Sequence, residues 1–425
     1  MRSGRATHNQ IAVSANQSET GLNEYQALDT TLLVSLSDIL SVDPRRESNA
    51  DELTGKEEPD TMYDNGQLAA GSFNFDKAQP QHFAFLASYG LGQCVSTAAG
   101  TGKLHTITPI DRDLDLNRSN PSFTAGQRYG DTVLKRLFAS MFVDSFTFTF
   151  QEDSWCKASG SLKGTGKVEE TVIEETVNAA KNATTLALAA NGVHGSTAQE
   201  RLDSIHRVRV ELAPGEWHEV DVTGVSAATP AELTITAPDA AADLVNYKVL
   251  YAFTEPAWCS FPSRVVESPL RVAQMTAHIG GKYDGTAFKG GRELSSELKL
   301  VEWSMSNNMQ IKFAPGAGGA YASKAFRDGR SQTLKLDRDF RDAILQMGMQ
   351  TNEYFSIHIL AEGAEFDTGH KYQVEVILPK IGIKNTSASV DGKLLSESTE
   401  FIVLQDAAHG SAIVKIKNLV AGYAA

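Results

Sequence analysis

The strongest constraint on this fold is a two-residue periodicity that recurs along most of the chain. In 144–151, DSFTFTFQ, the apolar residues Phe146, Phe148 and Phe150 alternate with hydroxyl residues. A strand places successive side chains on opposite faces, so the pattern predicts a strand with one buried and one polar face. Similar alternation predicts strands at 30–38, 72–76, 104–110, 144–151, 158–164, 298–306, 354–360, 372–379, 400–405 and 412–417. Alternation of this kind is typical of antiparallel sheets, and the sequence predicts a mainly β fold.

Helical spacing is found in only a few segments, at about 79–89, 338–347 and 199–204. The two longer segments follow the same plan, in which two alternating apolar residues precede an Asp and then a helix. The first copy has Phe73, Phe75, Asp76, Phe83, Leu86 and Ala87, and the second has Leu334, Leu336, Asp337, Phe340, Ile344 and Met347. We expect each Asp to accept a backbone N–H near the helix start.

The surroundings of the two helices are also alike, since each is preceded by a strand, a long loop and a second strand. From this agreement we infer a doubled domain, with copies at about 25–170 and 265–425. The loop of the first copy is long and charged, PRRESNADELTGKEEPDTMYDNG, and that of the second is rich in glycine.

Between the copies lie short strands separated by Gly, Pro and Asn, in a segment rich in Ala and Thr. This rhythm predicts a small inserted β-sandwich of immunoglobulin-like (Ig-like) size. The acidic run 168–178 is expected to lead into it as an extended arm. The full layout is an N-terminal arm (1–28), a first domain (29–175) with a long loop (39–68), the insert (176–258) and a second domain (259–425).

Composition narrows the classes of function. The net charge of −13 disfavours a protein that grips nucleic acid by neutralising phosphates. No apolar run approaches the roughly 20 residues that cross a bilayer, and the polar N-terminus has no secretion signal. We therefore expect a soluble chain made in a cytoplasm, without a membrane partner. The cysteines Cys94, Cys156 and Cys259 are widely spaced and are expected to be free thiols.

Motifs for catalysis or cofactor binding are incomplete. The Gly- and Lys-containing segments TAAGTGKL and SLKGTGKV both lack the first Gly and the final Ser or Thr of a phosphate loop. In DRDLDLN, Asp111, Asp113 and Asp115 have the spacing of a calcium loop, but Leu116 stands where a Gly is needed. No HExxH or GxSxG motif is present, and His358 on a strand is expected to be a hydrogen-bonded structural residue. We predict no enzyme, no cofactor and no metal site.

Several weak motifs occur in a familiar order. They are GSFNFDKAQPQHFAFLASYGLG, HTITPI, NPSFTAGQRYG, VDSFTFTFQEDSWCKASGSLKGTGK, VEWSMSNNMQIKFAPG and VEVILPKIGIKNTSASVDGKLLSESTEFIVL. In this order the chain resembles the tail tube (major tail) proteins of long-tailed, siphovirus-type bacteriophages. The resemblance covers about 28–170 and 265–420, and it matches the doubled-domain variant with an Ig-like decoration.

The resemblance implies two tandem tube domains, each a β-sandwich or barrel with one packed helix. It further implies subunits that pair their sheets into rings, stacked into a hollow tube that conducts DNA during ejection. A doubled subunit suggests three chains in a pseudo-hexameric ring. The implied partners are other copies of the chain, a tape measure protein in the lumen, tail terminator and distal tail or baseplate proteins at the ends, and passing double-stranded DNA without specific binding. The implied location is the virion tail, assembled in the bacterial cytoplasm.

Two groups of residues are the candidate sites in this interpretation. Polar residues that alternate with apolar ones are expected to face the lumen: Ser35, Ser37, Ser145, Thr147, Thr149, Glu302, Ser304 and Ser306. Charged residues of the long loop are candidates for contacts between subunits or rings: Arg45, Arg46, Glu47, Asp51, Glu52, Lys56, Glu57, Glu58 and Asp60. The same loop could instead be a solvated loop without a partner.

Two other functions are compatible with the sequence. A virion decoration or adhesin protein would bind host-surface glycans through the inserted sandwich. A β-rich hydrolase would need a carboxylate pair, which the spacing of Asp and Glu does not single out.

Overall fold

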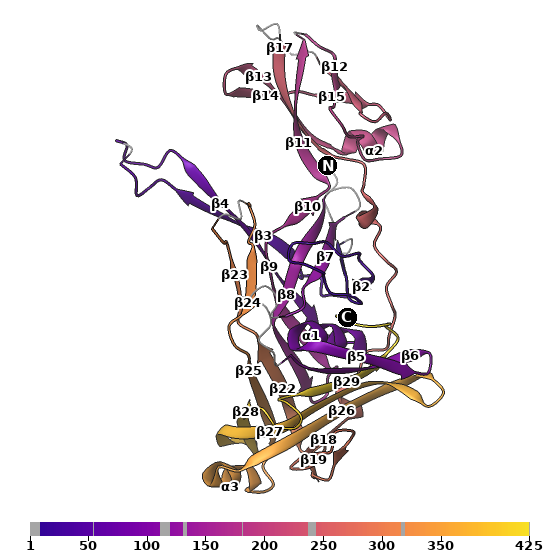
Figure 1. The fold of residues 1–425 in the computed structure, drawn as a ribbon, viewed down its shortest axis with the longest axis vertical. Helices are drawn as coiled ribbons and strands as arrows, with labels where there is room; N and C mark the ends of the chain where they lie inside the picture. Colours follow the sequence, from indigo (N-terminus) through magenta and orange to yellow (C-terminus); the bar gives the residue numbers. More distant parts are fainter. Residues whose placement is uncertain are drawn as a thin grey trace. The chain divides into compact units, whose positions relative to one another are not determined.

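The computed structural model describes residues 9–53, 55–110, 120–130, 134–180, 182–236, 244–315 and 319–424. The protein is mainly β, with several antiparallel sheets and three α-helices in these ranges (Figure 1). The calcium-like segment with Asp111, Asp113 and Asp115 lies outside the described residues. The chain forms two compact units: unit 1 comprises Met1–Ile11, Gly126–Leu137 and Val168–Phe261, and unit 2 comprises Ala12–Ala125, Phe138–Lys167 and Pro262–Ala425.

Unit 2 contains one long antiparallel sheet, here called the main sheet. Its strands lie in the order β3-β4-β9-β8-β22-β25-β28-β27, and each neighbouring pair is hydrogen-bonded. Their bounds are β3 Leu40–Ser48, β4 Met62–Phe75, β8 Lys135–Gln151, β9 Lys157–Gly164, β22 Leu298–Ser306, β25 Ser331–Asp339, β27 His370–Asp391 and β28 Leu394–Val403.

A second layer of strands continues from the first half of β27. In it β18-β26-β27-β29-β6-β5 are paired in this order. The bounds are β5 Gly92–Ala99, β6 Gly102–Pro109, β18 Met275–Ile279, β26 Tyr354–Asp367 and β29 Ile413–Asn418. Shorter strands are β1 Asn9–Val13, β2 Thr30–Leu32, β7 Phe123–Tyr129, β19 Lys282–Tyr283, β20 Phe288–Lys289, β21 Arg292–Glu293, β23 Met309–Lys312 and β24 Lys324–Arg327.

Helix α1 (Pro80–Leu91) is packed inside this sandwich, and all twelve of its residues are buried. It contacts β5, β6 and β29 of the second layer. On the other side Phe83 packs edge-to-face on Phe148 of the main sheet, with 4.8 Å between ring centroids. Helix α1 thus packs on the alternating phenylalanines of the main sheet.

The predicted cap of α1 was wrong. The helix begins at Pro80, and the extended residue Gln79 precedes it, whereas Asp76 lies in an exposed turn. Proline is suited to the first helical position because it has no N–H to satisfy and its φ is already helical. The backbone N–H of Gln79 donates to Nδ1 of His82 at 3.1 Å, which completes the helix start.

The second predicted helix, at 338–347, was also misplaced. Helix α3 runs from Ile344 to Thr351, and it buries Leu345 and Gly348 while Ile344 and Met347 are exposed. Strand β25 continues to Asp339, and Phe340 precedes the helix. Asp342, rather than Asp337, accepts the N–H of Ile344 at 3.0 Å.

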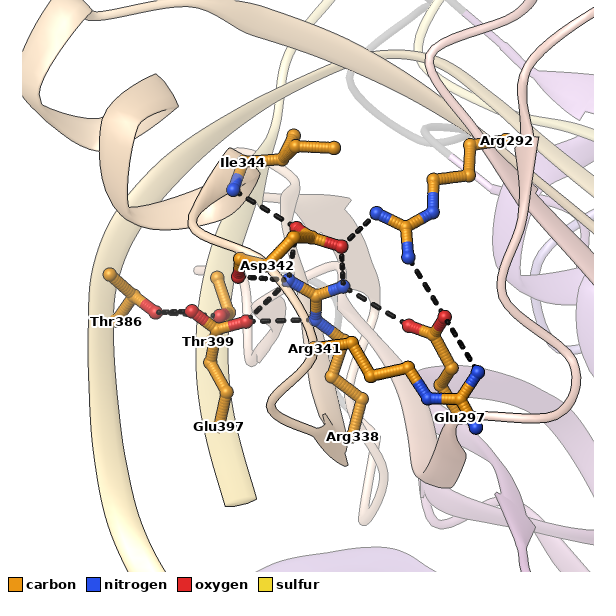
Figure 2. Close-up of polar contacts among 9 residues, drawn as sticks. All are labelled: Arg292, Glu297, Arg338, Arg341, Asp342, Ile344, Thr386, Glu397 and Thr399. Atoms are coloured by element: carbon orange, nitrogen blue, oxygen red, sulfur yellow. Dashed lines mark hydrogen bonds and ion pairs between the residues drawn. The ribbon is translucent and has the colours of Figure 1, made fainter. Parts of the chain in front are cut away.

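A buried ion cluster explains this shift (Figure 2). Arg338 is 1% exposed and pairs with Glu397 at 2.7 Å, Asp342 at 3.1 Å and Glu297 at 3.3 Å. Its guanidinium also donates to the backbone oxygen of Asp342 at 3.3 Å. Arg292 pairs with Glu297 and Asp342 as well. These bonds hold 338–342 outside the helix, and three arginines, counting Arg341, balance three carboxylates.

The main sheet repeats one pairing pattern. In the first strand group, β4 pairs with β3 and β9, and β9 pairs with β8. In the second strand group, β25 pairs with β22 and β28, and β28 pairs with β27. Helix α1 follows β4 in the first group, and helix α3 follows β25 in the second group. The two groups meet at the pairing of β8 with β22.

Unit 1 contains a small β-sandwich of two sheets, β11-β17-β13-β14 and β12-β16-β15. Its core includes Val208, Val210, Leu233 and Tyr247. The acidic run expected to be an arm instead forms β10 and β11, and β11 pairs with β17 along its whole length. The bounds are β10 Val168–Glu170, β11 Val172–Ala180, β12 Thr185–Ala187, α2 Ala198–Asp203, β13 Ile205–Ala213, β14 Glu216–Glu219, β15 Val222–Val225, β16 Glu232–Ile235 and β17 Leu244–Ala252.

Candidate functional site

Six of the eight residues expected to face a lumen lie together on one face of the main sheet. In the pairing of β8 with β22, Ser145 is opposite Ser306, Thr147 opposite Ser304, and Thr149 opposite Glu302. The hydroxyls of Thr147 and Ser304 are 2.9 Å apart. Segments 157 residues apart in the sequence therefore contribute to one surface, which we call the polar face.

The opposite face at this junction is apolar and buried. Phe148 lies opposite Trp303 in register, and both side chains are 0% exposed. Their rings pack edge-to-face with 5.5 Å between centroids. Aromatic pairs in this geometry contribute about 0.5–1.5 kcal/mol beyond their burial. The strict alternation seen in the sequence is thus a real division between two faces.

The polar face extends beyond the predicted residues. The strand registers place on it Ser72, Asn74, Ser159, Ser161, Thr333, Lys335, Asp337, Ser398 and Glu400, all at least partly exposed. The same alternation could have identified them in the segments SFNFD, ASGSLKG, SQTLKLD and SESTEF. Only the strand order shows that they adjoin the predicted residues.

Several charges on the polar face are paired with neighbours. Lys335 pairs with Asp337 at 3.2 Å, and Asp337 also accepts the Ser398 hydroxyl at 2.6 Å. Lys384 pairs with Glu400 at 3.3 Å. A phosphate that approached these lysines would have to compete with a carboxylate already in contact, which weakens its attraction. The face therefore combines hydroxyls with charges of which several are locally neutralised.

The strand expected through Ser35 and Ser37 was wrong. The expected strand 30–38 ends at Leu32, and Ser35 and Ser37 lie in a loop and turn with their hydroxyls 3.1 Å apart. The carboxylate of Asp38 accepts the backbone N–H groups of Ser35 at 3.1 Å and Asn74 at 2.6 Å. Hydrogen bonds of this kind compete with strand pairing because the Asp side chain satisfies the backbone locally. Burial raises the pKa of the Asp38 carboxyl.

The long charged loop, expected at 39–68, is a β-hairpin for most of its length. Strand β3 pairs with β4 from Leu40 opposite Gly71 to Ser48 opposite Met62. The hairpin projects from the rest of unit 2 (Figure 1). Arg45, Arg46 and Glu47 lie in β3, and the other candidates Asp51, Glu52, Lys56, Glu57, Glu58 and Asp60 lie at the tip.

The hairpin tip is organised by a single buried amide. Asn49 is 4% exposed and donates to Asp60 at 2.8 Å, while its oxygen accepts the backbone N–H groups of Asp60 and Thr61. Lys56 forms an ion pair with Asp60. Around this turn Leu53 is fully exposed, and so is most of the hairpin's side-chain surface. The hairpin is thus ordered locally, and most of its side-chain surface is exposed.

Groups with catalytic potential are engaged in structural contacts. Burial raises the pKa of the Glu267 carboxyl to about 7, and this carboxylate accepts the backbone N–H groups of Gln81 and Leu419. Burial likewise raises the pKa of Glu19, which is bonded to the hydroxyls of Ser122, Thr124 and Ser140. His358 is bonded to Glu375 at 2.9 Å, as expected for a structural histidine.

The three cysteines are free thiols, and burial raises the pKa of Cys156 and Cys259 to about 12. Within the described ranges, no group of three or more His, Cys, Asp or Glu side chains is placed to hold a metal ion. None of the helices in the described part of the chain is long and apolar enough to span a membrane.

No protein-family model matches this chain, and no curated protein matches it.

Proposed function

We propose that this chain is a structural subunit that assembles into the hollow tail tube of a long-tailed bacteriophage and has no enzymatic activity. The observation that carries the proposal is the main sheet, an eight-stranded sheet whose apolar face packs in part against α1 and whose opposite face is polar at the β8–β22 junction. A sheet of this kind is suited to be a wall, because each strand adds area to both faces at once. The kind of assembly, a phage tail tube, is taken from the resemblance of the sequence to tail tube proteins.

The polar face is proposed to line the lumen. Its hydroxyls and its paired charges, such as Lys335 with Asp337, offer DNA few sites of attachment. The net charge of −13 also disfavours the binding of DNA. Double-stranded DNA would therefore pass through the lumen without specific binding, and the tape measure protein would lie inside the lumen.

The repeated pairing pattern supports the interpretation of a doubled tube domain. Two strand groups per chain favour a ring of three chains with pseudo-six-fold symmetry. The sandwich of unit 1 would be a decoration of the tube, and the β3–β4 hairpin would contact the adjacent ring or subunit. Tail terminator and distal tail or baseplate proteins would bind the two ends of the stack. The tube would be assembled in the bacterial cytoplasm and function in the virion.

Electron microscopy of the purified protein at increasing concentration tests the proposal. We expect rings or tubes, and end-on views with three or six equal lobes. Monomers that persist at all concentrations and salt conditions would contradict it.

The location of the polar face is tested in the assembled tubes. Ser161 is exposed on this face, and Glu216 is exposed on the sandwich of unit 1. A gold-maleimide label on S161C should appear inside the tube, and a label on the matched control E216C should appear outside. The opposite distribution would refute the assignment of the lumen.

A further inference from the structure

Strands β5, β6 and β29 bring together a serine, a histidine and an asparagine that no sequence motif connects. Ser96 of β5 is opposite His105 of β6, and β6 pairs in turn with β29 (Figure 1). Oγ of Ser96 lies 2.8 Å from Nδ1 of His105, and Nε2 of the same ring lies 2.9 Å from Oδ1 of Asn418. The three side chains thus form one hydrogen-bonded chain across three strands.

The direction of these hydrogen bonds follows from the surroundings of Asn418. The backbone N–H of Val420 donates to Oδ1 at 3.0 Å, and the amide nitrogen donates to the Tyr423 hydroxyl at 2.7 Å. Because Oδ1 can only accept, Nε2 of His105 carries the ring proton. Nδ1 of a neutral ring then has a lone pair, and the Ser96 hydroxyl donates its proton to it.

The histidine is buried, whereas the serine is exposed. His105 and Asn418 are both 0% exposed, and Ser96 is exposed on β5, the last strand of the second layer. Burial lowers the pKa of His105 from the ordinary value of 6.5, so the ring is neutral at pH 7. A reagent can therefore reach Oγ of Ser96, and the base behind it is in the form that accepts a proton.

We propose that Ser96 is a nucleophile that accepts an acyl group, with His105 as its general base and Asn418 as the residue that positions the base. A hydroxyl is a weak nucleophile by itself, and an adjacent base that removes its proton during the attack makes it reactive. Unrelated hydrolases use the same order of groups, a nucleophile, a histidine and an orienting side chain. The inference goes beyond the proposed function and does not depend on it, because transfer of one acyl group to the chain is a modification and needs no turnover.

The transfer is balanced without an oxidant or a cofactor. Oγ of Ser96 forms a bond to the acyl carbon, and the bond from that carbon to the leaving group breaks. The hydroxyl proton passes to Nδ1 of His105 and from there to the leaving group or to solvent, while Oδ1 of Asn418 holds the imidazolium. The products are an ester of Ser96 and the free leaving group.

The donor is an activated acyl compound, such as an aryl ester or a thioester. Its leaving group is a weak base, so it departs without protonation by a second acid. The C-terminal segment, 419–424, runs beside the hydroxyl, since a Cβ added at Gly422 would lie 3.9 Å from Oγ of Ser96. This contact favours a small acyl group.

A competing nucleophile lies next to the serine. Sγ of Cys94 is 3.9 Å from Oγ of Ser96. Burial raises the pKa of the Cys94 thiol, which lowers the share of thiolate at pH 7. Because the thiolate is the reactive form of cysteine, we expect the acyl group on Ser96 rather than on Cys94.

Acetylation of the full-length protein by p-nitrophenyl acetate, with the site mapped by mass spectrometry of peptides, tests the proposal. Ser161 is the internal control, because it is exposed on β9 and its cross-strand neighbours are Ser72 and Ser145. General base catalysis contributes about 10²–10⁴-fold, so Ser96 should be acetylated at least about tenfold faster than Ser161. Equal rates at the two serines, or acetylation of Cys94 instead of Ser96, would overturn the proposal.

The pH profile distinguishes an activated serine from an ordinary one. The rate at Ser96 should rise to a plateau with a midpoint below pH 6.5, because neutral His105 is the active form. A rate that rises in proportion to hydroxide up to pH 9 would mean that no base assists the serine, and the proposal would fail.

The groups around His105 are included in this test. The ring faces Cys94 of β5, Lys103 of β6 and Tyr423 of the C-terminal segment, and Glu267 accepts a backbone N–H of that segment. Burial raises the pKa of Cys94 and Tyr423, so both are neutral at pH 7, and the charge of Lys103 adds to the effect of burial on His105. Burial also raises the pKa of Glu267 to about 7, so the profile is measured in E267Q as well, which should have the same midpoint.

Two substitutions separate the chemistry from the structure. H105Q can still form hydrogen bonds with Ser96 and Asn418 but has no base, so acetylation of Ser96 should fall at least about tenfold in protein whose fold circular dichroism confirms. N418D keeps an acceptor for Nε2–H and adds a negative charge, which favours the imidazolium, so the midpoint of the profile should move to higher pH. An unchanged rate in H105Q would overturn the role of the base, and an unchanged midpoint in N418D would overturn the role of Asn418.

Discussion

Substitution of Arg338 tests the role of the buried ion cluster directly. The change Arg338→Phe leaves Glu397, which is 0% exposed, without its cation. Removal of one partner of a buried ion pair costs about 3–5 kcal/mol, because the remaining charge is neither solvated nor paired. We expect R338F to lower the free energy of unfolding by this amount.

The chain itself supplies the compensating change. In the first strand group the equivalent pair is apolar, with Phe75 opposite Ala158, where the second group has Arg338 opposite Glu397. The double variant R338F/E397A reproduces that pair and removes the unpaired carboxylate. It should recover at least about 2 kcal/mol relative to R338F, since apolar replacements of buried ion pairs are often nearly neutral.

Urea unfolding followed by tryptophan fluorescence and circular dichroism would measure both changes. The matched control is K384A, which breaks the Lys384–Glu400 pair between β27 and β28, where the side chains are 58% and 52% exposed. Exposed pairs contribute about 0–1 kcal/mol. A loss below about 1 kcal/mol for R338F, or a double variant as unstable as R338F, would refute the assignment of a tightly coupled buried cluster.

Three further predictions concern stability and assembly. Burial raises the pKa of Glu267 to about 7 from an ordinary value of 4.5. The free energy of unfolding is therefore highest below pH 4.5, where this carboxyl is protonated in both states, and it falls by up to roughly 3 kcal/mol as the pH rises through 7. The difference between the urea midpoints at pH 5 and pH 8 should be smaller for E267Q than for the wild-type protein. In G166A a Cβ would lie 2.2 Å from the oxygen of Gln67 at a φ of +87°, whereas G369A, at a φ of +73°, meets no atom within 4 Å. Thermal unfolding should show a loss larger by about 1–3 kcal/mol for G166A, and equal losses would contradict the clash. Replacement of the hairpin tip, 50–60, by a short turn should leave the melting temperature within about 2 °C of the wild-type value, because the tip is exposed. The same replacement should abolish the stacking of rings in electron micrographs. Normal tubes would exclude the hairpin from contacts between rings.

The sequence was most informative where side-chain polarity alone decides the local structure. Alternation in DSFTFTF and VEWSMS identified strands whose two faces the structure confirms, because burial of Phe148 and Trp303 requires the period of a strand. It was least informative where a local bond competes with the pattern. The expected strand through Ser35 and Ser37 is a turn because Asp38 satisfies the backbone there, and the helix expected at 338 starts six residues later because Arg338 is held by the ion cluster.

The candidate site shows the same division. Residue types and spacing alone determined that Ser145, Thr147 and Ser304 lie on polar faces of strands. Only the tertiary structure decided that these strands are neighbours, since pairing of β8 with β22 depends on contacts across about 150 residues that no local pattern encodes. Likewise, the sequence determined that 42–66 is charged, whereas strand pairing decided that most of it is a projecting hairpin. Local periodicity is set by the geometry of one strand, but strand order is set by which apolar surfaces can be buried together, and this is a property of the whole fold.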